Sequence, residues 1–251
     1  MTPLRPFFSY YGSCWRQVRH LPPPTQPRLI EPFAGSASYA LHYPHLKIHL
    51  NDINPTVAGT WEFLIKASAS EILALPDEPH DGLPQEARWL IGWWLGKAQS
   101  QPRIGAPRGG WASKYAQKSS AVVWTWGQAA RERIARQVGF IRHWRITSQN
   151  YLDLEGVSAT WFIDPPYDCP AGEHYPHGRG GLDFAQIAHW CRSRSGQVVA
   201  IERDGARWLP FVALRQGVGA SCRRRVPLAV WGSEGARTDA RGQCDLFGWG
   251  K

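Results

Sequence analysis

The sequence predicts an α/β protein, and three segments carry that prediction. Residues 28–36 read as a short apolar strand followed by a tight turn of small residues around Gly35. Residues 47–52 read as a second strand with an acid, Asp52, at its tip, and residues 160–164 as a third, buried strand that ends in another acid. A ligand in such a fold binds beyond the carboxyl ends of the strands. We therefore predict a Rossmann-like sheet whose functional site lies where the strands end.

Length and composition narrow the interpretation. The 251 residues are enough for one α/β domain that carries an insertion. The formal net charge is +9, and 23 of the 29 basic residues are Arg, which indicates an anionic partner bound through bidentate contacts. Nucleic acid is the leading candidate, and the alternative is a solvated basic surface without a partner. The 14 Trp and 8 Tyr residues could stack on bases, although most should lie in the core.

Cysteine usage and hydropathy indicate a soluble protein of the reducing cytoplasm. The cysteines are far apart and form no Cys-x-x-Cys pair, so neither a zinc site nor a disulfide framework is predicted. They are Cys14, Cys169, Cys191, Cys222 and Cys244. No apolar run approaches the ~20 residues of a membrane span, and the first residues lack the apolar block of a signal peptide.

The chain begins with an aromatic arm, residues 5–16, which leads into a Gly-Ser turn. Such an arm could wrap a small heterocyclic ligand, or it could be pinned to the core. The Pro-rich connector that follows, residues 21–27, can be neither a helix nor a central strand.

The first glycine turn and the tip of the second strand are candidate parts of one ligand site. A helix is expected to begin near Ala37, so that its N-terminus faces the ligand. The turn lacks a full Gly-x-Gly-x-x-Gly pattern, which argues against a dinucleotide cofactor. Asp52 is placed to accept both ribose hydroxyls of an adenosine ligand. Alternatively, Asp52 caps the helix that begins near Pro55, a role that Asn54 could fill equally well.

The middle of the chain predicts helices joined by a basic loop. Helical patterns cover residues 56–66, 85–97 and 128–144, and the last of these is amphipathic and rich in Arg. The polar, Gly-rich segment 98–120 interleaves basic residues with aromatic ones, a combination typical of nucleic-acid contact. Its candidate DNA-binding residues are Arg103, Arg108, Lys114 and Lys118. The alternative for this segment is a mobile surface loop. A strand and turn over 145–153 then return to the sheet.

The corner Asp164-Pro165-Pro166-Tyr167 is the strongest functional signal. The prolines end the strand because they cannot donate to its ladder, and Pro166 also restricts the backbone before it. A carboxylate, a carbonyl and an aromatic ring therefore leave the strand in a nearly fixed arrangement. This arrangement suits methylation of an exocyclic amino group, with two acceptors for the amino hydrogens and a ring for a flipped base. The alternative is an ordinary loop start.

The remainder of the chain completes the sheet. The Gly- and His-rich loop over 168–181 contains three candidate substrate contacts, His174, Tyr175 and His177. A metal there is conceivable, but such a loop without a partnered Cys is more typical of polar contacts, and we assign no metal. The expected later elements are a helix over 182–193, a central strand over 197–201, a strand that begins in 208–214 and a late strand over 223–231. Pro227 favours an edge position for the last of these.

Taken in order, the aromatic arm, Glu31 to Ser36, Asn51 to Asn54 and Asp164 to Tyr167 resemble the Dam-type DNA adenine methyltransferases, especially the short versions carried by bacteriophages and prophages. The resemblance spans nearly the whole chain except the middle third. It implies the methyltransferase form of the Rossmann-like sheet, with seven strands and a terminal β-hairpin. It also implies a catalytic domain over 1–71 and 146–251 and a helical target-recognition insertion over 72–145.

The resemblance further implies S-adenosylmethionine as the cofactor and adenine in double-stranded DNA as the substrate. We expect a monomer, without membrane or metal contacts, in the cytoplasm of a bacterial or phage-infected cell. The catalytic residues that match are Asp164, Pro165, Pro166 and Tyr167. The cofactor-binding residues are Phe8, Tyr10, Tyr11, Gly12, Glu31, Pro32, Phe33, Ala34, Gly35, Asp52, Asn150, Tyr151 and Asp164.

Two positions depart from the family pattern. Asn150 stands where the family often has an Asp, and Cys14 stands where it usually has a Lys. Because this cation is missing, one alternative is a DNA-binding protein that retains the fold but not the catalysis. Within the enzyme class, methylation of the cytosine amino group is the alternative, because the same acceptors could serve it.

Overall fold

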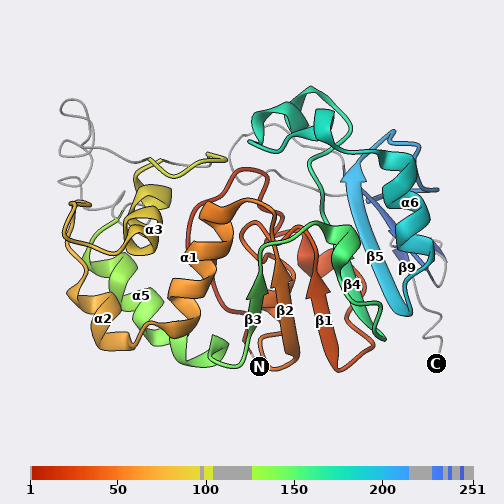
Figure 1. Ribbon diagram of the computed structural model, residues 1–251. Helices are drawn as coiled ribbons and strands as arrows, with labels where there is room; N and C mark the ends of the chain where they lie inside the picture. The colour runs from red at the N-terminus through yellow and green to blue at the C-terminus, as the bar shows by residue number, and fades with distance from the viewer. Residues whose placement is uncertain are drawn as a thin grey trace.

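A computed structural model of the chain describes residues 2–96, 99–103, 126–214 and 228–233, together with the backbone of two short strands at 237–238 and 244–245. Its centre is a seven-stranded sheet in the order β3-β2-β1-β4-β5-β7-β6 (Figure 1). The strands are β1 Arg28–Glu31, β2 Lys47–Asn51, β3 Arg145–Thr147, β4 Ala159–Ile163, β5 Gly196–Arg203, β6 Val212–Leu214 and β7 Leu228–Gly232. Strand β7 runs antiparallel to both of its neighbours, and the other pairs are parallel. The protein is thus a mixed α/β protein with a mostly parallel sheet, compatible with a Rossmann-like fold.

The helices lie at the two ends of the sheet. Figure 1 shows α2, α3 and α5 gathered beyond α1 on the β3 side, and α6 beside β5. The α-helices are α1 Pro55–Lys66, α2 Ala69–Ala74, α3 Gln85–Leu95, α5 Gln128–Val138 and α6 Phe184–Arg192. The 3-10 helices are η1 Val18–His20, η2 Ala40–His42, η4 Gly139–Ile141, η5 Tyr151–Asp153, η6 Pro170–His174 and η7 Arg179–Gly181. Outside the main sheet, β8 Arg237–Thr238 pairs with β9 Cys244–Asp245 in a two-stranded ribbon. No helix in the described ranges combines the length and the apolar character that crossing a membrane would need.

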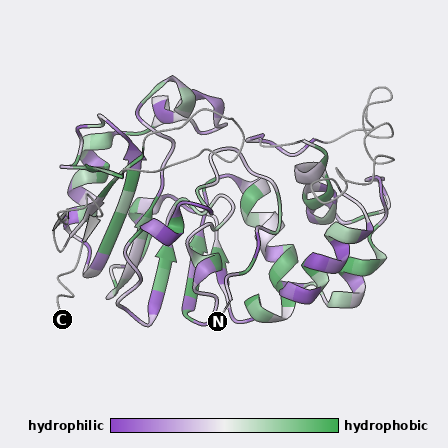
Figure 2. Cartoon of the chain, turned by 180° about the vertical axis from the view of Figure 1, so that it is seen from behind, coloured by the Kyte–Doolittle hydropathy of each residue, from purple (hydrophilic) through white to green (hydrophobic). Residues whose placement is uncertain are grey.

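Both faces of the sheet are buried, and β4 is its most enclosed strand. All five of its residues are buried, with Phe162 on one face and Trp161 and Ile163 on the other. Figure 2 shows the hydrophobic residues concentrated on the strands. Such near-continuous apolar strands are expected where a parallel sheet is covered on both sides.

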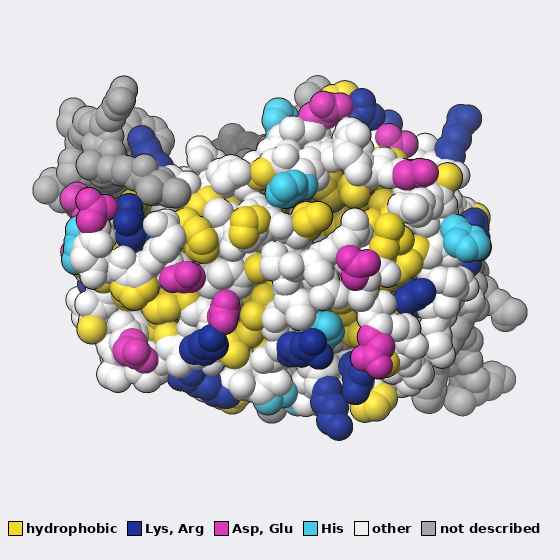
Figure 3. Space-filling view, viewed as in Figure 1, with side chains coloured by type: hydrophobic (Ala, Val, Ile, Leu, Met, Phe, Trp, Pro, Cys, Tyr) yellow, Lys and Arg dark blue, Asp and Glu magenta, His cyan; other side chains and the backbone are white. Residues whose placement is uncertain are grey.

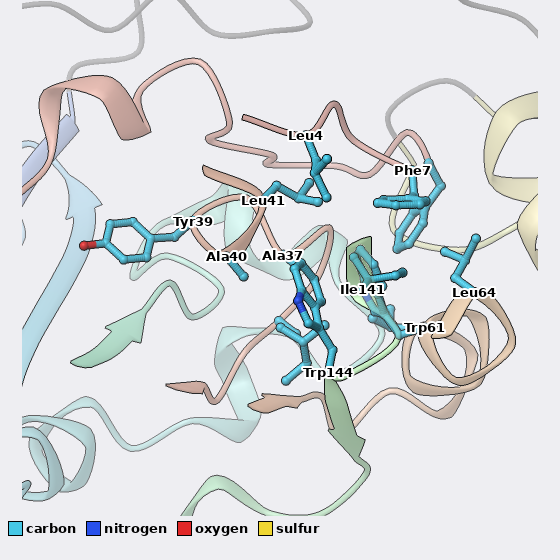
Figure 4. Packing of buried hydrophobic residues seen from close by; sticks show 14 of the residues in the cluster. Leu4, Phe7, Ala37, Tyr39, Ala40, Leu41, Trp61, Leu64, Ile141 and Trp144 are labelled. Atoms are coloured by element: carbon cyan, nitrogen blue, oxygen red, sulfur yellow. The ribbon is translucent and has the colours of Figure 1, made fainter. Parts of the chain in front are cut away.

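The N-terminal arm is pinned to the core on one side of this sheet. Phe7 and Phe8 are buried, and their rings lie 5.6 and 5.4 Å from the ring of Trp61 in α1 (Figure 4). Trp94 of α3 donates its indole N–H to the Phe7 carbonyl at 2.9 Å. This part of the arm is therefore pinned to the core, against the helical middle of the chain. The residues from Tyr10 to Ser13 instead line a pocket at the end of the sheet.

The prediction of a helix that begins near Ala37 is wrong. Residues 35–39 form turns, followed only by the short helix η2. Ala37 adopts a positive φ of 51°, which an α-helix cannot contain. The amide of Ala40 donates to the Glu31 carboxylate at 2.5 Å instead of to a helical carbonyl. The buried Glu31 side chain thus satisfies the first N–H of η2, while the positive φ of Ala37 keeps a longer helix from forming.

The edge position predicted for the last strand is also wrong. Strand β7 pairs with both β5 and β6, so β6 is the outer strand of the described sheet at that end. The strand begins at Leu228, one residue after Pro227, so every residue inside β7 has an N–H to donate. The expectation failed because a proline limits only the ladder position that it occupies itself.

Candidate active site

A pocket of about 420 Å³ opens where β1, β2 and β4 end. Its lining combines the segments after β1 and β2, the corner after β4, the arm from Tyr10 to Ser13 and the loop from Tyr175 to Gly178. Of the predicted cofactor-binding residues, all except Phe8 line it. Phe8 instead stacks on Trp93 at 5.6 Å, beneath Tyr10. Segments that are far apart in the sequence therefore meet in one cavity, because the carboxyl ends of parallel strands share one edge of a sheet.

Asp52 joins two loops at the mouth of this pocket. Its carboxylate accepts the Gly35 amide at 2.8 Å and the Asn54 amide at 2.9 Å. Asn54, and not Asp52, caps α1, because the Asn54 side chain accepts the amide of Thr56 at 3.0 Å. Each carboxylate oxygen of Asp52 keeps a further lone pair for a ligand hydroxyl. Burial raises the pKa of Asp52 to about 6.

Glu31 forms the floor of the pocket beside the glycine turn. The side chain is 1% exposed, and burial raises its pKa well above the usual range. Gly35, with a φ of +46°, passes under Tyr10, and a Cβ on Gly35 would lie 2.9 Å from the Tyr10 ring. Only glycine combines that conformation with that close approach, so this turn requires a glycine at position 35.

The Cys14 thiol and the Tyr167 hydroxyl lie close enough to Asp164 to affect its pKa. Burial raises the pKa of Asp164 to about 7, while these two groups oppose the rise and the charge of Glu202 adds to it. Pro166 lines the pocket as Asp164 does, whereas Pro165 and Tyr167 are not part of the lining. The ring that the sequence assigns to stacking a base thus packs against the core and not into the pocket.

Cys14 is 3% exposed. Burial raises the pKa of its thiol, and the charges of Asp164 and Glu31 raise it further. The position at which the resemblance expects a Lys is thus within the influence of the candidate catalytic acid. Arg16, two residues further on, is exposed and does not line the pocket.

The loop over 168–181 covers one side of the pocket. The Tyr175 ring lies 6.1 Å from that of Tyr10 and 5.3 Å from that of Tyr11, and its hydroxyl donates to the Tyr11 carbonyl at 3.3 Å. A Cβ on Gly12 would lie 2.1 Å from this hydroxyl, so a glycine is required beneath it. His177 also lines the pocket, and His174 is exposed next to Tyr11. Two of the three residues assigned to DNA thus share the cavity with the cofactor residues.

Asn150 and Tyr151 line the pocket on the opposite side. Asn150 accepts the Leu152 amide at 3.0 Å and so begins η5. Tyr151 packs 5.2 Å from Phe33 and donates its hydroxyl to Gln186 at 3.2 Å. Asn150 therefore serves the local turn and also lines the pocket.

Several lining residues were missed by sequence reasoning. Ile53 lines the pocket and is 47% exposed, which is unusual for an isoleucine. Because it directly follows Asp52, its place in the lining could have been inferred from the sequence. Three hydroxyls, those of Ser13, Ser36 and Ser38, form a triangle with sides of 3.0 to 3.2 Å. No local pattern predicts that triangle, because Ser13 comes from the arm while Ser36 and Ser38 belong to the turn after β1.

The predicted DNA-binding cations lie mostly outside the described residues. Arg108, Lys114 and Lys118 belong to that part of the chain, and Arg103 is described at its margin, where its amide donates to the Gly92 carbonyl at 3.1 Å. On the face shown in Figure 3, the described Lys and Arg side chains are interspersed with Asp and Glu. Among the described residues, no cluster of His, Cys, Asp and Glu could hold a metal ion.

Comparisons with known protein families and with curated proteins find no match to this chain. The interpretation of the pocket therefore rests on its own geometry and chemistry.

Proposed function

We propose that the protein is an S-adenosylmethionine-dependent DNA methyltransferase that modifies the exocyclic amino group of adenine. One observation carries the proposal. Asp164 and Pro166 of the corner, the acid after β2 and the glycine turn after β1 line one pocket. A site for methyl transfer to a base needs these three parts within one cavity, namely acceptors for the amino group, an acceptor for a ribose and a turn that admits the rest of the cofactor.

The charge of the pocket supports this choice of cofactor. Glu31, Asp52 and Asp164 all line it, whereas its described lining includes no Lys or Arg. Nucleoside triphosphates and dinucleotides carry phosphates, which such a lining would repel. S-adenosylmethionine has no phosphate, and its sulfonium and ammonium groups are both cationic. The residues present therefore fit this cofactor, with Asp52 at the ribose and Glu31 at the amino acid part.

Asp164 is the group that would act on the target base. When bound, the cofactor supplies an electrophilic methyl group. The ionised carboxylate of Asp164 and the carbonyl of Pro165 would each accept one amino hydrogen, which directs the nitrogen lone pair outward. The methylated nitrogen is acidic and loses a proton readily, so no stronger base is required. The Tyr167 ring, which does not line the pocket in this structure, would turn toward a flipped base that enters and stack on it.

Transfer of tritium from labelled S-adenosylmethionine to unmethylated DNA, followed by nucleoside analysis, tests the proposal. Label in N6-methyladenine is the expected result. Label in N4-methylcytosine would favour the alternative substrate. DNA binding without transfer would favour a protein that retains the fold and has lost catalysis, an alternative that Cys14 keeps open.

The rate of methyl transfer should depend on the ionisation of Asp164. Since the pKa of Asp164 is about 7 and only the ionised form accepts hydrogen bonds with both oxygens, the rate should be highest above that value and fall as the pH drops through it. Single-turnover rates in a pH series that spans this value provide the measurement. A profile that stays flat across the series would mean that Asp164 does not act as the ionised acceptor.

Replacement of Cys14 by Lys is expected to raise activity. An ammonium beside Asp164 would lower the pKa of this acid and so increase its ionised fraction near neutral pH. The gain in the single-turnover rate could reach tenfold for each ~1.4 kcal/mol recovered, and the acid limb of the pH profile should move to lower pH. Arg16→Ala serves as the control, because Arg16 is exposed outside the pocket. No gain with Lys, together with a large loss for Arg16→Ala, would show that Arg16 supplies the cation.

Target recognition is assigned to the insertion over 72–145, and its basic loop gives a separate prediction. Neutralising Arg103, Arg108, Lys114 and Lys118 together should weaken DNA binding and flatten its dependence on salt, because each lost phosphate contact removes about one released counterion. Binding titrations at several salt concentrations measure the slope. An unaltered slope would place the phosphate contacts elsewhere in the chain.

A further inference from the structure

Glu202 is a buried acid that the proposed chemistry does not use. It lies near the carboxyl end of β5, the strand next to β4, and its side chain has no exposed surface. None of the described Lys, Arg or His residues forms an ion pair with it. A charged side chain is rarely buried without a cation unless several hydrogen-bond donors surround it.

Three N–H groups converge on this carboxylate. One oxygen accepts the Asp168 amide at 3.0 Å and the Trp208 indole N–H at 3.1 Å. The other oxygen accepts the Arg203 amide at 2.8 Å. A carboxylate can satisfy three donors because it offers only acceptors, whereas an amide at the same place would turn its NH₂ group toward one of them.

The donors come from segments that border the active site. Asp168 directly follows Tyr167 of the corner, and Gly172 in the same loop packs so closely that a Cβ there would lie 2.1 Å from the Tyr167 carbonyl oxygen. The Trp208 ring lies 5.7 Å from that of Phe184 in the first turn of α6. The residue before Phe184, Asp183, caps α6 and lines the pocket. One carboxylate thus connects the corner to the pocket wall.

We infer that Glu202 is a positioning residue for the proposed methyl transfer: by holding the backbone immediately after Tyr167, it fixes the Asp164 to Tyr167 corner against the wall of the pocket. This inference rests on the proposed function. Glu202 has a second effect on the corner, because its charge helps to keep the pKa of Asp164 raised. Its role is therefore both geometric and electrostatic, and the two contributions can be separated.

The test compares Glu202→Gln with Asp204→Asn, which removes an exposed acid two residues further along the chain. Glu202→Gln should lower the single-turnover rate about tenfold to a hundredfold, because a buried donor loses its acceptor, while the affinity for S-adenosylmethionine changes less than threefold. The acid limb of the pH profile should move to lower pH, because the charge that raises the pKa of Asp164 is gone. A purely structural role would not move that limb. The control should match the wild type in all three measurements.

Hydrogen exchange over residues 164–181 gives a readout that does not depend on activity. Faster exchange in Glu202→Gln supports the positioning role even if the wild-type protein transfers no methyl group, an outcome that would remove only the proposed function. Unchanged exchange, rate and pH profile would overturn the inference.

Glu202→Asp covers the case in which the Gln variant does not fold. It keeps the charge and shortens the reach, so the rate should fall while the acid limb stays in place. A wild-type rate and wild-type exchange in Glu202→Asp would equally overturn the inference.

Discussion

Replacement of Asp164 by Ala should abolish methyl transfer while the affinity for S-adenosylmethionine stays within a few-fold of the wild type. In the proposed mechanism, Asp164 polarises the target amine and does not anchor the cofactor, so the loss should appear in kcat. The variant also removes the carboxylate that lies near the Cys14 thiol and the Tyr167 hydroxyl. Single-turnover kinetics and calorimetry of cofactor binding measure the two quantities separately.

Asp164→Asn and Asp204→Ala complete this experiment. The Asn variant keeps the shape and one acceptor oxygen but cannot ionise, so it should be nearly as inactive as Ala and should lose the dependence on pH. Asp204 is exposed, and its replacement should change nothing. Wild-type turnover in Asp164→Ala would refute the mechanism.

Replacement of Asp52 by Ala is expected to have the opposite signature, a loss of cofactor affinity. Two ribose hydroxyls would lose a charged acceptor, which corresponds to about 1.5–3 kcal/mol. The amides of Gly35 and Asn54 would lose their partner as well, so the glycine turn should loosen. Calorimetry measures the affinity, and the rate at saturating cofactor should fall much less than the affinity does.

Asp77→Ala is the matched control for Asp52→Ala, because Asp77 is a surface acid paired with Arg131. Its replacement should leave cofactor affinity unchanged. Unchanged affinity in Asp52→Ala itself would leave this acid with only the structural role that its two backbone bonds describe.

The positions of the strands could be predicted from the sequence because each is a short apolar run with a distinctive end. Strands β1, β2 and β4 lie where the apolar runs before Glu31, Asp52 and Asp164 place them. The convergence of these ends could also be predicted, since parallel strands that begin on one side of a sheet end together on the other. Most of the candidate pocket follows from those two facts.

What could not be predicted depends on contacts between distant residues. The helix expected near Ala37 is broken by the positive φ of Ala37, and the distant Glu31 carboxylate accepts the Ala40 amide where the short helix η2 begins. The placement of β7 between β5 and β6 depends on which strand edges are free, which no local pattern records. Glu202 lies 34 residues from the Asp168 amide that it binds. In the sequence, Glu202 is merely a polar residue within an apolar strand, and nothing near it indicates its distant partner.

The acids of the pocket also tie ligand binding to the exchange of protons with the solvent. The pKa values of Asp52 and Asp164 are about 6 and about 7, so near neutral pH a fraction of the empty sites holds a proton on one of them. A cationic ligand favours the ionised forms and must expel that proton as it enters. Cofactor affinity would therefore weaken as the surroundings acidify, and the heat of binding would include the heat with which the buffer takes up the released proton. The pocket would thus respond to acidity before any DNA is bound.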